Sequence, residues 1–174
     1  LAEYLGLPYA VGVASGTDAL LLPLQALDPE PGAAVILPAF TFFATAGAAW
    51  NAGFKPVFCD VDPETFNVTA DTLEAVWTEK TRAVVPVHLY GQMAPMRSIR
   101  ALASRRGAFV LEDAAQAVGA RQRFPAADLG SRASGSVAAG FAAPGTSPEA
   151  GARKDGGGAT LALREETATE GWTM

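Results

Sequence analysis

The sequence predicts an α/β fold, a three-layer sandwich in which helices cover both faces of a mostly parallel sheet. From Tyr9 to about Ala120, short β-rich runs alternate with longer helical patterns, as they do in repeated βαβ units. The strand-like runs are almost continuously apolar, which is typical of strands buried on both faces. A chain of 174 residues that is 49% hydrophobic can bury such a core within one domain.

The expected elements follow one another in order along the chain. Runs rich in apolar and β-branched residues are expected to form strands at 10–13, 34–37, 56–61, 82–89 and 108–111. Helical patterns fill the intervals at 15–27, at 41–51, after the capping residues Thr69-Ala70-Asp71, and at 98–106. Turn and capping residues separate these elements: Pro31-Gly32, Gly53, Asp62-Pro63-Glu64 and Gly107.

The last third of the chain has a different composition. Residues 121–174 contain half of the 18 glycines and few large aliphatic side chains. Such a segment loses much entropy on folding and gains little from burial, so we expect loose order at 122–158 and at most a helical turn or two at 161–169. The expected organisation is therefore an α/β portion at 1–120 and a divergent Gly/Ala-rich tail at 121–174.

Composition argues against several classes of function. The net charge is −5 and no basic cluster is longer than Arg105-Arg106, which argues against a nucleic-acid partner. No apolar run approaches the roughly 18 residues that span a bilayer, and no signal-peptide pattern is present, so no membrane partner is expected. Cys59 is the single cysteine, which excludes an intrachain disulfide, argues against a thiolate metal site and fits a cytoplasmic protein.

The run Ser15-Gly16-Thr17-Asp18-Ala19-Leu20 follows the first expected strand and opens a helix. Unpaired backbone N–H groups and the positive end of the helix dipole at such a point can cradle a phosphate. An ordinary Ser or Thr N-cap explains the same residues. Both interpretations remain open at this stage.

Two further groups lie where strands are expected to end. One ring of Phe40-Thr41-Phe42-Phe43 either stacks on a flat ligand or packs in the core. Asp113 and Gln116 face one way if a helical turn begins there, and they then offer a carboxylate and an amide to one ligand; a helix cap is the alternative. A phosphate cradle, an aromatic ring and a carboxylate together match pyridoxal phosphate, whose ring nitrogen needs an anionic partner.

These residues lie in stretches that resemble signatures of the DegT/DnrJ/StrS sugar aminotransferases, which are fold-type I pyridoxal phosphate enzymes. The stretches are Ser15-Gly16-Thr17-Asp18-Ala19-Leu20, Pro38-Ala39-Phe40-Thr41-Phe42, Pro56-Val57-Phe58-Cys59-Asp60-Val61-Asp62, Pro86-Val87-His88-Leu89-Tyr90-Gly91-Gln92 and Glu112-Asp113-Ala114-Ala115-Gln116. The resemblance covers Leu1 to about Ala120. It implies the large-domain fold of these enzymes, pyridoxal 5'-phosphate as cofactor, and transfer of an amino group from a glutamate-like amino acid to a keto sugar, often nucleotide-linked.

The resemblance also implies roles for individual residues. The implied cofactor contacts are Gly16, Thr17 and Asp18 to the phosphate, Phe42 by stacking on the ring, Asp113 to the ring nitrogen and Gln116 toward the phenolic oxygen. His88 lies in a family-like strand, where we expect it to be structural rather than catalytic. Tyr90 receives no role.

The chain departs from the family at the residue that carries the chemistry. The family continues with a Ser-Phe-x-Pro-x-Lys motif whose lysine binds the cofactor covalently. With Pro144 aligned to the motif's proline, the serine position falls on Phe141 and the lysine position on Thr146, which has no amine. Lys154 precedes a family-like Asp-Gly-Gly stretch at a different spacing; it is the substitute candidate for the missing lysine, but a solvated loop lysine is the preferred interpretation. We therefore assign no catalytic residue. Residues 122–154 resemble what a GC-rich coding region yields when it is read out of frame, and genuine divergence from the family is the alternative.

Three functional hypotheses follow. The first is a sugar aminotransferase, whose full-length parent is expected to be a homodimer with active sites at the subunit interface. The second is a catalytically inactive fragment or pseudoenzyme, because the Schiff-base lysine is missing. Both ends also look truncated against the family, and such a protomer would expose apolar surface and associate non-natively. The third is a Rossmann-like nucleotide-binding module, which is disfavoured because no G-x-G-x-x-G follows the strand expected at 10–13.

Overall fold

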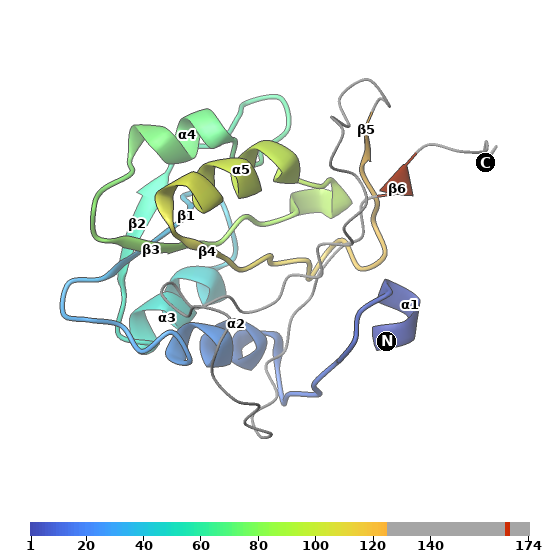
Figure 1. The fold of residues 1–174 in the computed structure, drawn as a ribbon, viewed down its shortest axis with the longest axis horizontal. Helices are drawn as coiled ribbons and strands as arrows, with labels where there is room; N and C mark the ends of the chain where they lie inside the picture. Colours follow the sequence, from blue (N-terminus) through green and yellow to red (C-terminus); the bar gives the residue numbers. More distant parts are fainter. Residues whose placement is uncertain (125–165, 168–174) are drawn as a thin grey trace, which may run out of the picture.

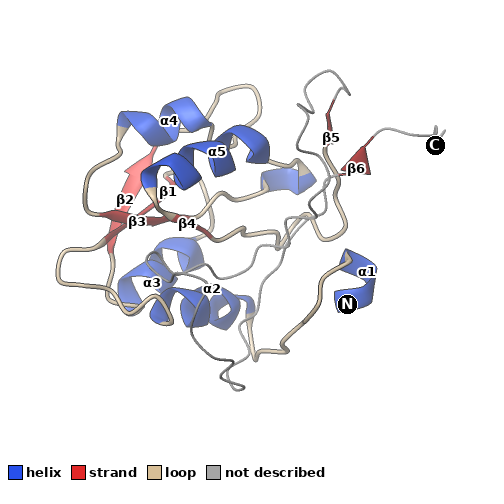
Figure 2. Ribbon diagram, viewed as in Figure 1, coloured by secondary structure: helices blue, strands red, loops and turns tan. Residues whose placement is uncertain are grey.

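The computed structural model describes residues 1–124 and 166–167, and its main feature is a four-stranded parallel sheet. The strands lie in the order β2-β1-β3-β4: β1 (Ala34–Pro38), β2 (Lys55–Cys59), β3 (Thr81–Val84) and β4 (Phe109–Val110). Helices α2 (Gly16–Gln25) and α3 (Phe43–Asn51) cover one face, and α4 (Ala70–Ala75) and α5 (Met96–Arg106) cover the other (Figure 1 and Figure 2). The predicted α/β sandwich is confirmed.

The pleat of β1 explains why its run of apolar residues is uninterrupted. Val35 and Leu37 belong to the core cluster that includes side chains of α2 and α3, whereas Ile36 belongs to the cluster that includes side chains of α4 and α5. Successive residues of a strand point to opposite faces, so a strand with helices on both sides needs apolar residues at every position. All five residues of β1 are buried.

Local sequence signals fix the ends of the helices. The Ser15 hydroxyl accepts the Asp18 N–H at the start of α2. Thr69 and Thr72 form a capping box at the start of α4, in which each side chain accepts the other residue's backbone N–H. Gly107 ends α5 in the left-handed region at φ 68°, where a side chain would be strained. These three signals were recognisable in the sequence.

The topology brings the ends of β1, β3 and β4 to one edge of the sheet. The chain leaves β1 through α3 on one face and leaves β3 through α5 on the other face. Ligands of open α/β sheets bind at such a switch point, beyond the carboxyl ends of the strands. Parallel pairing continues past the strand limits to a bridge between Val87 and Asp113, so these two segments reach the edge together.

Two expectations about secondary structure were wrong. Residues 10–13 are not a strand: a strand needs a neighbour to bond to, no described strand pairs with this segment, and Val11 is 42% exposed. Glu166–Thr167 form strand β6, paired in parallel with β5 (Arg123–Phe124), where a helical turn was expected within 161–169. Hydrogen bonds between β5 and β6 satisfy backbone groups of both segments. A prediction from local helical propensity does not take such a distant partner into account.

The remaining described elements are short. Helix α1 (Ala2–Leu5) lies near the N-terminus, and the 3-10 turn η1 (Leu89–Gly91) follows the extension of β3. Most of the 121–174 tail lies outside the described residues, so its expected looseness and the division at residue 120 stay predictions. Across residues 1–124 and 166–167, no helix is both long and apolar enough to cross a bilayer.

Candidate functional site

The candidate site is built around Asp113, which lies just beyond β4 at the carboxyl edge of the sheet. Its backbone is fixed on both sides, because its N–H donates to Pro86 O at 2.9 Å and its carbonyl accepts the His88 N–H at 3.0 Å. These bonds continue the parallel pairing of the two chain segments past the strands themselves. The side chain therefore projects from a rigid backbone.

Both oxygens of the Asp113 carboxylate accept a hydrogen bond. The Thr45 hydroxyl donates to Oδ2 at 3.2 Å, and the Ala115 N–H donates to Oδ1 at 3.2 Å. The Thr45 hydroxyl also contacts the Thr41 hydroxyl at 3.2 Å. A carboxylate oxygen has two lone pairs, so each Asp113 oxygen keeps capacity for a further donor.

Thr45 is the residue of this site that the sequence analysis missed. It is 1% exposed on the first turn of α3, and its contact with Asp113 joins the segment after β1 to the segment after β4 across 68 residues of chain. A polar residue on the buried side of a helix needs a partner, and this was the available signal. Its partner could not be identified without the sheet order.

The phenylalanines that follow β1 are exposed rather than packed in the core. Phe42 is the N-cap residue of α3 and is 78% exposed, and Phe40 and Phe43 are also exposed. The core-packing alternative for these rings is therefore wrong. The Thr45 N–H donates to Phe42 O at 3.2 Å, so Phe42 lies one helical turn from the threonine that holds Asp113.

Gln116 follows Asp113 in a turn and not in a helix. The helical turn that would place Asp113 and Gln116 on one side does not form, and no helix follows Asp113 for its side chain to cap within the described residues; the Ala115 N–H bonds instead to the Asp113 side chain. The Gln116 Oε1 accepts the Tyr90 N–H at 2.6 Å. Since a backbone N–H can only donate, the facing atom of Gln116 must be its oxygen, and the amide nitrogen remains to donate elsewhere.

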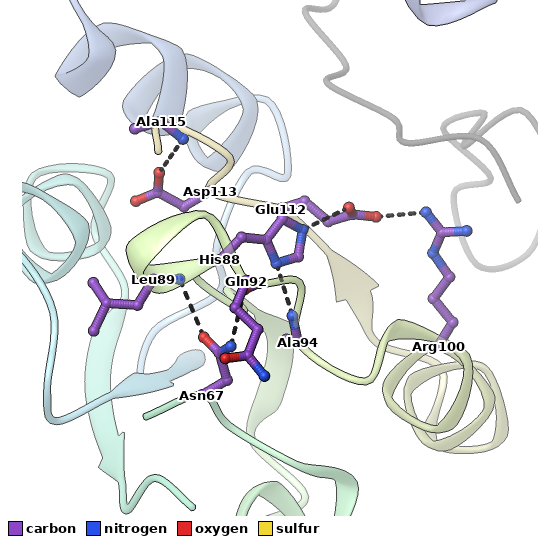
Figure 3. A network of polar contacts seen from close by, with 9 residues as sticks. All are labelled: Asn67, His88, Leu89, Gln92, Ala94, Arg100, Glu112, Asp113 and Ala115. Carbon is purple, nitrogen blue, oxygen red and sulfur yellow. Dashed lines mark hydrogen bonds and ion pairs between the residues drawn. The ribbon is translucent and has the colours of Figure 1, made fainter. Parts of the chain in front are cut away.

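Tyr90 occupies a conformation that non-glycine residues rarely adopt, with φ 58°. The side chain of Asn67 holds the surrounding turn: its Oδ1 accepts the Leu89 N–H at 3.1 Å, and its Nδ2 donates to Gln92 O at 2.9 Å (Figure 3). Asn67 is buried, so both bonds are shielded from water. The turn that presents Tyr90 to Gln116 is thus fixed from both ends.

The N-terminus of α2 shows the N-cap that the sequence left as an alternative to a phosphate cradle. Ser15 Oγ accepts the Asp18 N–H at 3.1 Å and donates to the Asp18 carboxylate at 3.0 Å. The Asp18 N–H is therefore engaged within the cap. Gly16 and Thr17 are exposed, and a Cβ placed on Gly16 would meet nothing within 4 Å.

The His88 ring lies beside Glu112, on the opposite side of the segment 112–113 from the Asp113 carboxylate (Figure 3). It is fully buried, its Nδ1 accepts the Ala94 N–H at 3.2 Å, and its Nε2 contacts Glu112 Oε2 at 3.1 Å. Because Nδ1 accepts, the proton is on Nε2 and is donated to Glu112. The Arg100 guanidinium donates to the other Glu112 oxygen. These contacts fit the structural role expected for His88.

Within the described part of the chain, the pKa values of two groups outside the candidate site are shifted. Burial raises the pKa of the Cys59 thiol to about 11. The backbone N–H and the hydroxyl of Thr65 lower the pKa of the Asp62 carboxyl, which also caps the turn at residues 62–65. Within residues 1–124 and 166–167, no group of three or more His, Cys, Asp or Glu side chains is arranged to hold a metal ion.

The sequence comparison decides the family. The model of the DegT/DnrJ/EryC1/StrS aminotransferase family matches residues 1–141. This chain belongs to that family. DegT-family aminotransferases use pyridoxal phosphate as cofactor, and the resemblance of the sequence motifs to this family is confirmed.

Two curated proteins are similar to this chain over most of its sequence. The pleiotropic regulatory protein of Geobacillus stearothermophilus is 54% identical over 121 residues, which are 70% of this chain and 32% of that protein. The UDP-N-acetyl-3-dehydro-alpha-D-glucosamine 3-aminotransferase of Acidithiobacillus ferrooxidans is 52% identical over 116 residues, which are 67% of this chain and 31% of that protein. The chain spans about a third of the length of the curated relatives it matches.

Solved DegT-family structures share the fold as well as the sequence. The crystal structure of NtdA from Bacillus subtilis with bound cofactor PMP matches with a TM-score of 0.65 at 41% identity, over 68% of this chain and 27% of that one. This supports fold-type I for the present sheet. Thr146 and Lys154, the two positions considered for the missing lysine, lie outside the described residues.

Proposed function

We propose that this chain is the cofactor-binding part of a pyridoxal phosphate-dependent aminotransferase that transfers an amino group from a glutamate-like donor to a keto sugar, often nucleotide-linked. The observation that carries the proposal is the Asp113 carboxylate, held by Thr45 and Ala115 at the carboxyl edge of the sheet. Family membership and the sugar aminotransferase among its relatives support the reaction class.

The described residues fit the cofactor. Asp113 has capacity to accept the N–H of the pyridine ring, and Gln116 has an amide nitrogen to donate to the phenolic oxygen. Phe42 has an exposed ring that can cover one face of the pyridine. Each of these groups is still able to make the contact that the family assigns to it.

The N-terminus of α2 supplies the phosphate contacts in this proposal. Gly16 and Thr17 carry N–H groups of the first helical turn, which has no intrahelical acceptors, and the Thr17 hydroxyl can donate as well. The open space beside Gly16 leaves room for the phosphate to approach the backbone. Asp18 contributes through the cap that orders this turn, because its own N–H donates to Ser15.

When bound, pyridoxal phosphate supplies an electron sink for the α-carbon of the substrate. The part of Asp113 is to hold the proton on the ring nitrogen by an ionic hydrogen bond. The part of Gln116 is to orient the ring through its phenolic oxygen, and that of Phe42 is to keep water from one face of the ring. A measurement of cofactor binding tests these roles of Asp113, Gln116 and Phe42 without requiring turnover.

The first experiment is binding of pyridoxamine phosphate, which needs no lysine, to the full chain. Asp113→Asn is expected to weaken binding at least tenfold, because the charged partner of the ring nitrogen is lost. Asp28→Asn is the matched control, since Asp28 is exposed before the amino end of β1 and is expected to leave binding unchanged. Equal binding by wild type and Asp113→Asn would refute the assignment of Asp113.

A second experiment separates an active enzyme from an inactive relative. The chain is mixed with pyridoxal phosphate, desalted, reduced with borohydride and mapped by peptide mass, and it is assayed for α-ketoglutarate released from glutamate with a UDP-linked 3-keto sugar. A label on Lys154 together with turnover would support the enzyme. Retention of cofactor without a covalent adduct would support the alternative, a pseudoenzyme that lacks the Schiff-base lysine at the position of Thr146.

We also propose a homodimer as the functional assembly in the cytoplasm. Phe42, Phe43 and Tyr90 expose aromatic surface beside the carboxyl edge of the sheet, which a second copy would cover. Sedimentation at several concentrations tests this, and a monomer throughout would contradict it. The buried, unpaired thiol of Cys59 fits a reducing compartment, and cell fractionation tests the location.

A further inference from the structure

The Asp113 carboxylate is oriented by an ordered pair of hydroxyl groups. Thr45 Oγ1 donates to Asp113 Oδ2, so its single proton is used in that bond. The contact between the Thr45 and Thr41 hydroxyls at 3.2 Å can then have only Thr41 as its donor. The direction of the chain of bonds is therefore Thr41 to Thr45 to Asp113.

The environment of Thr45 suggests more than helix packing. Threonine in a helix commonly bonds back to the carbonyl four residues earlier, which would be that of Thr41. The Thr45 hydroxyl bonds instead to the Thr41 hydroxyl and to the Asp113 carboxylate. Thr45 is 1% exposed, so water does not compete for this bond.

The Thr45 bond and the Ala115 bond together fix the rotation of the carboxylate. The Ala115 N–H donates to Oδ1 from the residues that follow Asp113, whereas Thr45 donates to Oδ2 from α3. The Asp113 backbone is fixed by Pro86 and His88. Removal of the Thr45 hydroxyl would leave one side-chain bond, so that the Asp113 side chain can leave its χ1 rotamer.

We propose that Thr45, oriented by Thr41, is a positioning residue that fixes the Asp113 carboxylate in the direction required to meet the ring nitrogen of the cofactor. This inference rests on the proposed role of Asp113. Binding groups must be held to within about 0.5 Å and 10–20° by the groups behind them, and the hydroxyl of Thr45 supplies that support from α3.

The test compares Thr45→Val, which removes the hydroxyl at nearly constant volume, with Thr45→Ser, which keeps it. Thr81→Val is the matched control, because Thr81 is also a buried hydroxyl but lies at the first residue of β3, away from the carboxyl edge. Thr45→Val is expected to weaken pyridoxamine phosphate binding about tenfold, Thr45→Ser to restore it to within about twofold, and Thr81→Val to leave it unchanged.

A second readout needs no cofactor. In the wild-type chain, the three-bond couplings of Asp113 Cγ to the backbone nitrogen and carbonyl carbon are expected to report a single χ1 rotamer. In Thr45→Val they are expected to move to rotamer-averaged values, and in Thr45→Ser to return. A merely structural role of the hydroxyl would lower stability without changing these couplings.

The two readouts keep the inference distinct from the proposed function. If wild type does not bind pyridoxamine phosphate, the proposed function fails, and averaged couplings in Thr45→Val would still support the orienting role. A folded Thr45→Val with a single Asp113 rotamer and unchanged binding overturns the inference. If Thr45→Val does not fold, the Thr41→Val variant tests the inference instead. Partial averaging of the Asp113 couplings in Thr41→Val supports the orienting role of the two hydroxyls, and unchanged couplings overturn it.

Discussion

Removal of the His88 imidazole is expected to destabilise the fold more than any surface substitution. His88 is fully buried and bonds to the Ala94 N–H and to the Glu112 carboxylate. In His88→Ala the Ala94 N–H is left without its acceptor, which costs about 1–3 kcal/mol. Among the described residues, Glu112, whose side chain is 4% exposed, then keeps Arg100 as its one partner. Leaving the buried Glu112 carboxylate without its His88 donor and opening a cavity raise the expected loss to about 3–5 kcal/mol.

The assay is urea unfolding at pH 7, followed by tryptophan fluorescence. Trp77 packs partly buried against the α4 and α5 side of the sheet, so its emission reports on this core. The midpoint is expected to fall while the slope m stays unchanged. Because domains of this size are stable by about 5–15 kcal/mol, a loss of about 3–5 kcal/mol removes from about a fifth to all of the stability and should be easily measured.

Two isosteric variants assign the loss to individual bonds. His88→Asn places an oxygen near Nδ1 and keeps the acceptor for Ala94, whereas His88→Gln places an amide nitrogen near Nε2 and keeps the donor to Glu112. Each is expected to recover about half of the stability lost in His88→Ala. A loss below about 1 kcal/mol in His88→Ala would refute the reasoning, since it would mean that neither bond contributes to the fold.

Three smaller predictions follow from local contacts. Ser15→Ala is expected to lower stability by about 1 kcal/mol in urea unfolding, because α2 loses its cap, whereas Ser15→Thr keeps most of it. Cys59, with a pKa raised to about 11, is expected to resist iodoacetamide at pH 8.5 until urea unfolds the chain, and rapid labelling of the native state would contradict this. The lowered pKa of Asp62 stabilises the fold above its ordinary value of 3.8, an effect lost as the pH falls through the lower folded value. The difference in urea midpoint between wild type and Asp62→Asn should therefore be larger at pH 6 than at pH 3.

The sequence predicted the elements that depend on local chemistry. Strand β1 was recognisable because every residue is apolar, and α5 because Gly107 stops it. The strand expected at 10–13 was wrong because apolar residues specify a strand only when a partner lies beside them. Sheet order is a long-range property, so no local pattern could report which neighbours that segment has.

The residues of the candidate site that follow a local sequence pattern were predicted, and those that depend on contacts between distant segments were not. Asp113 was identified by its place after an apolar strand, and Phe42 by its place after β1. Thr45 was missed because its partner is 68 residues away, and its contact exists only once β1, β3 and β4 lie in order. Gln116 was identified, but its bond to Tyr90 depends on a left-handed turn that no motif in the sequence specifies.

Strand geometry couples the stability of this fold to its candidate site. Glu112 and Asp113 are consecutive, and successive residues of an extended chain point to opposite sides. On one side Glu112 is held by His88 and Arg100, and on the other Asp113 accepts from Ala115 (Figure 3). Asp113 also accepts from Thr45. His88 belongs to both arrangements, because its backbone N–H donates to Asp113 O while its ring donates to Glu112. A substitution that loosens the buried cluster therefore also moves the backbone that carries Asp113, so His88 variants should weaken pyridoxamine phosphate binding even at urea concentrations where they remain folded.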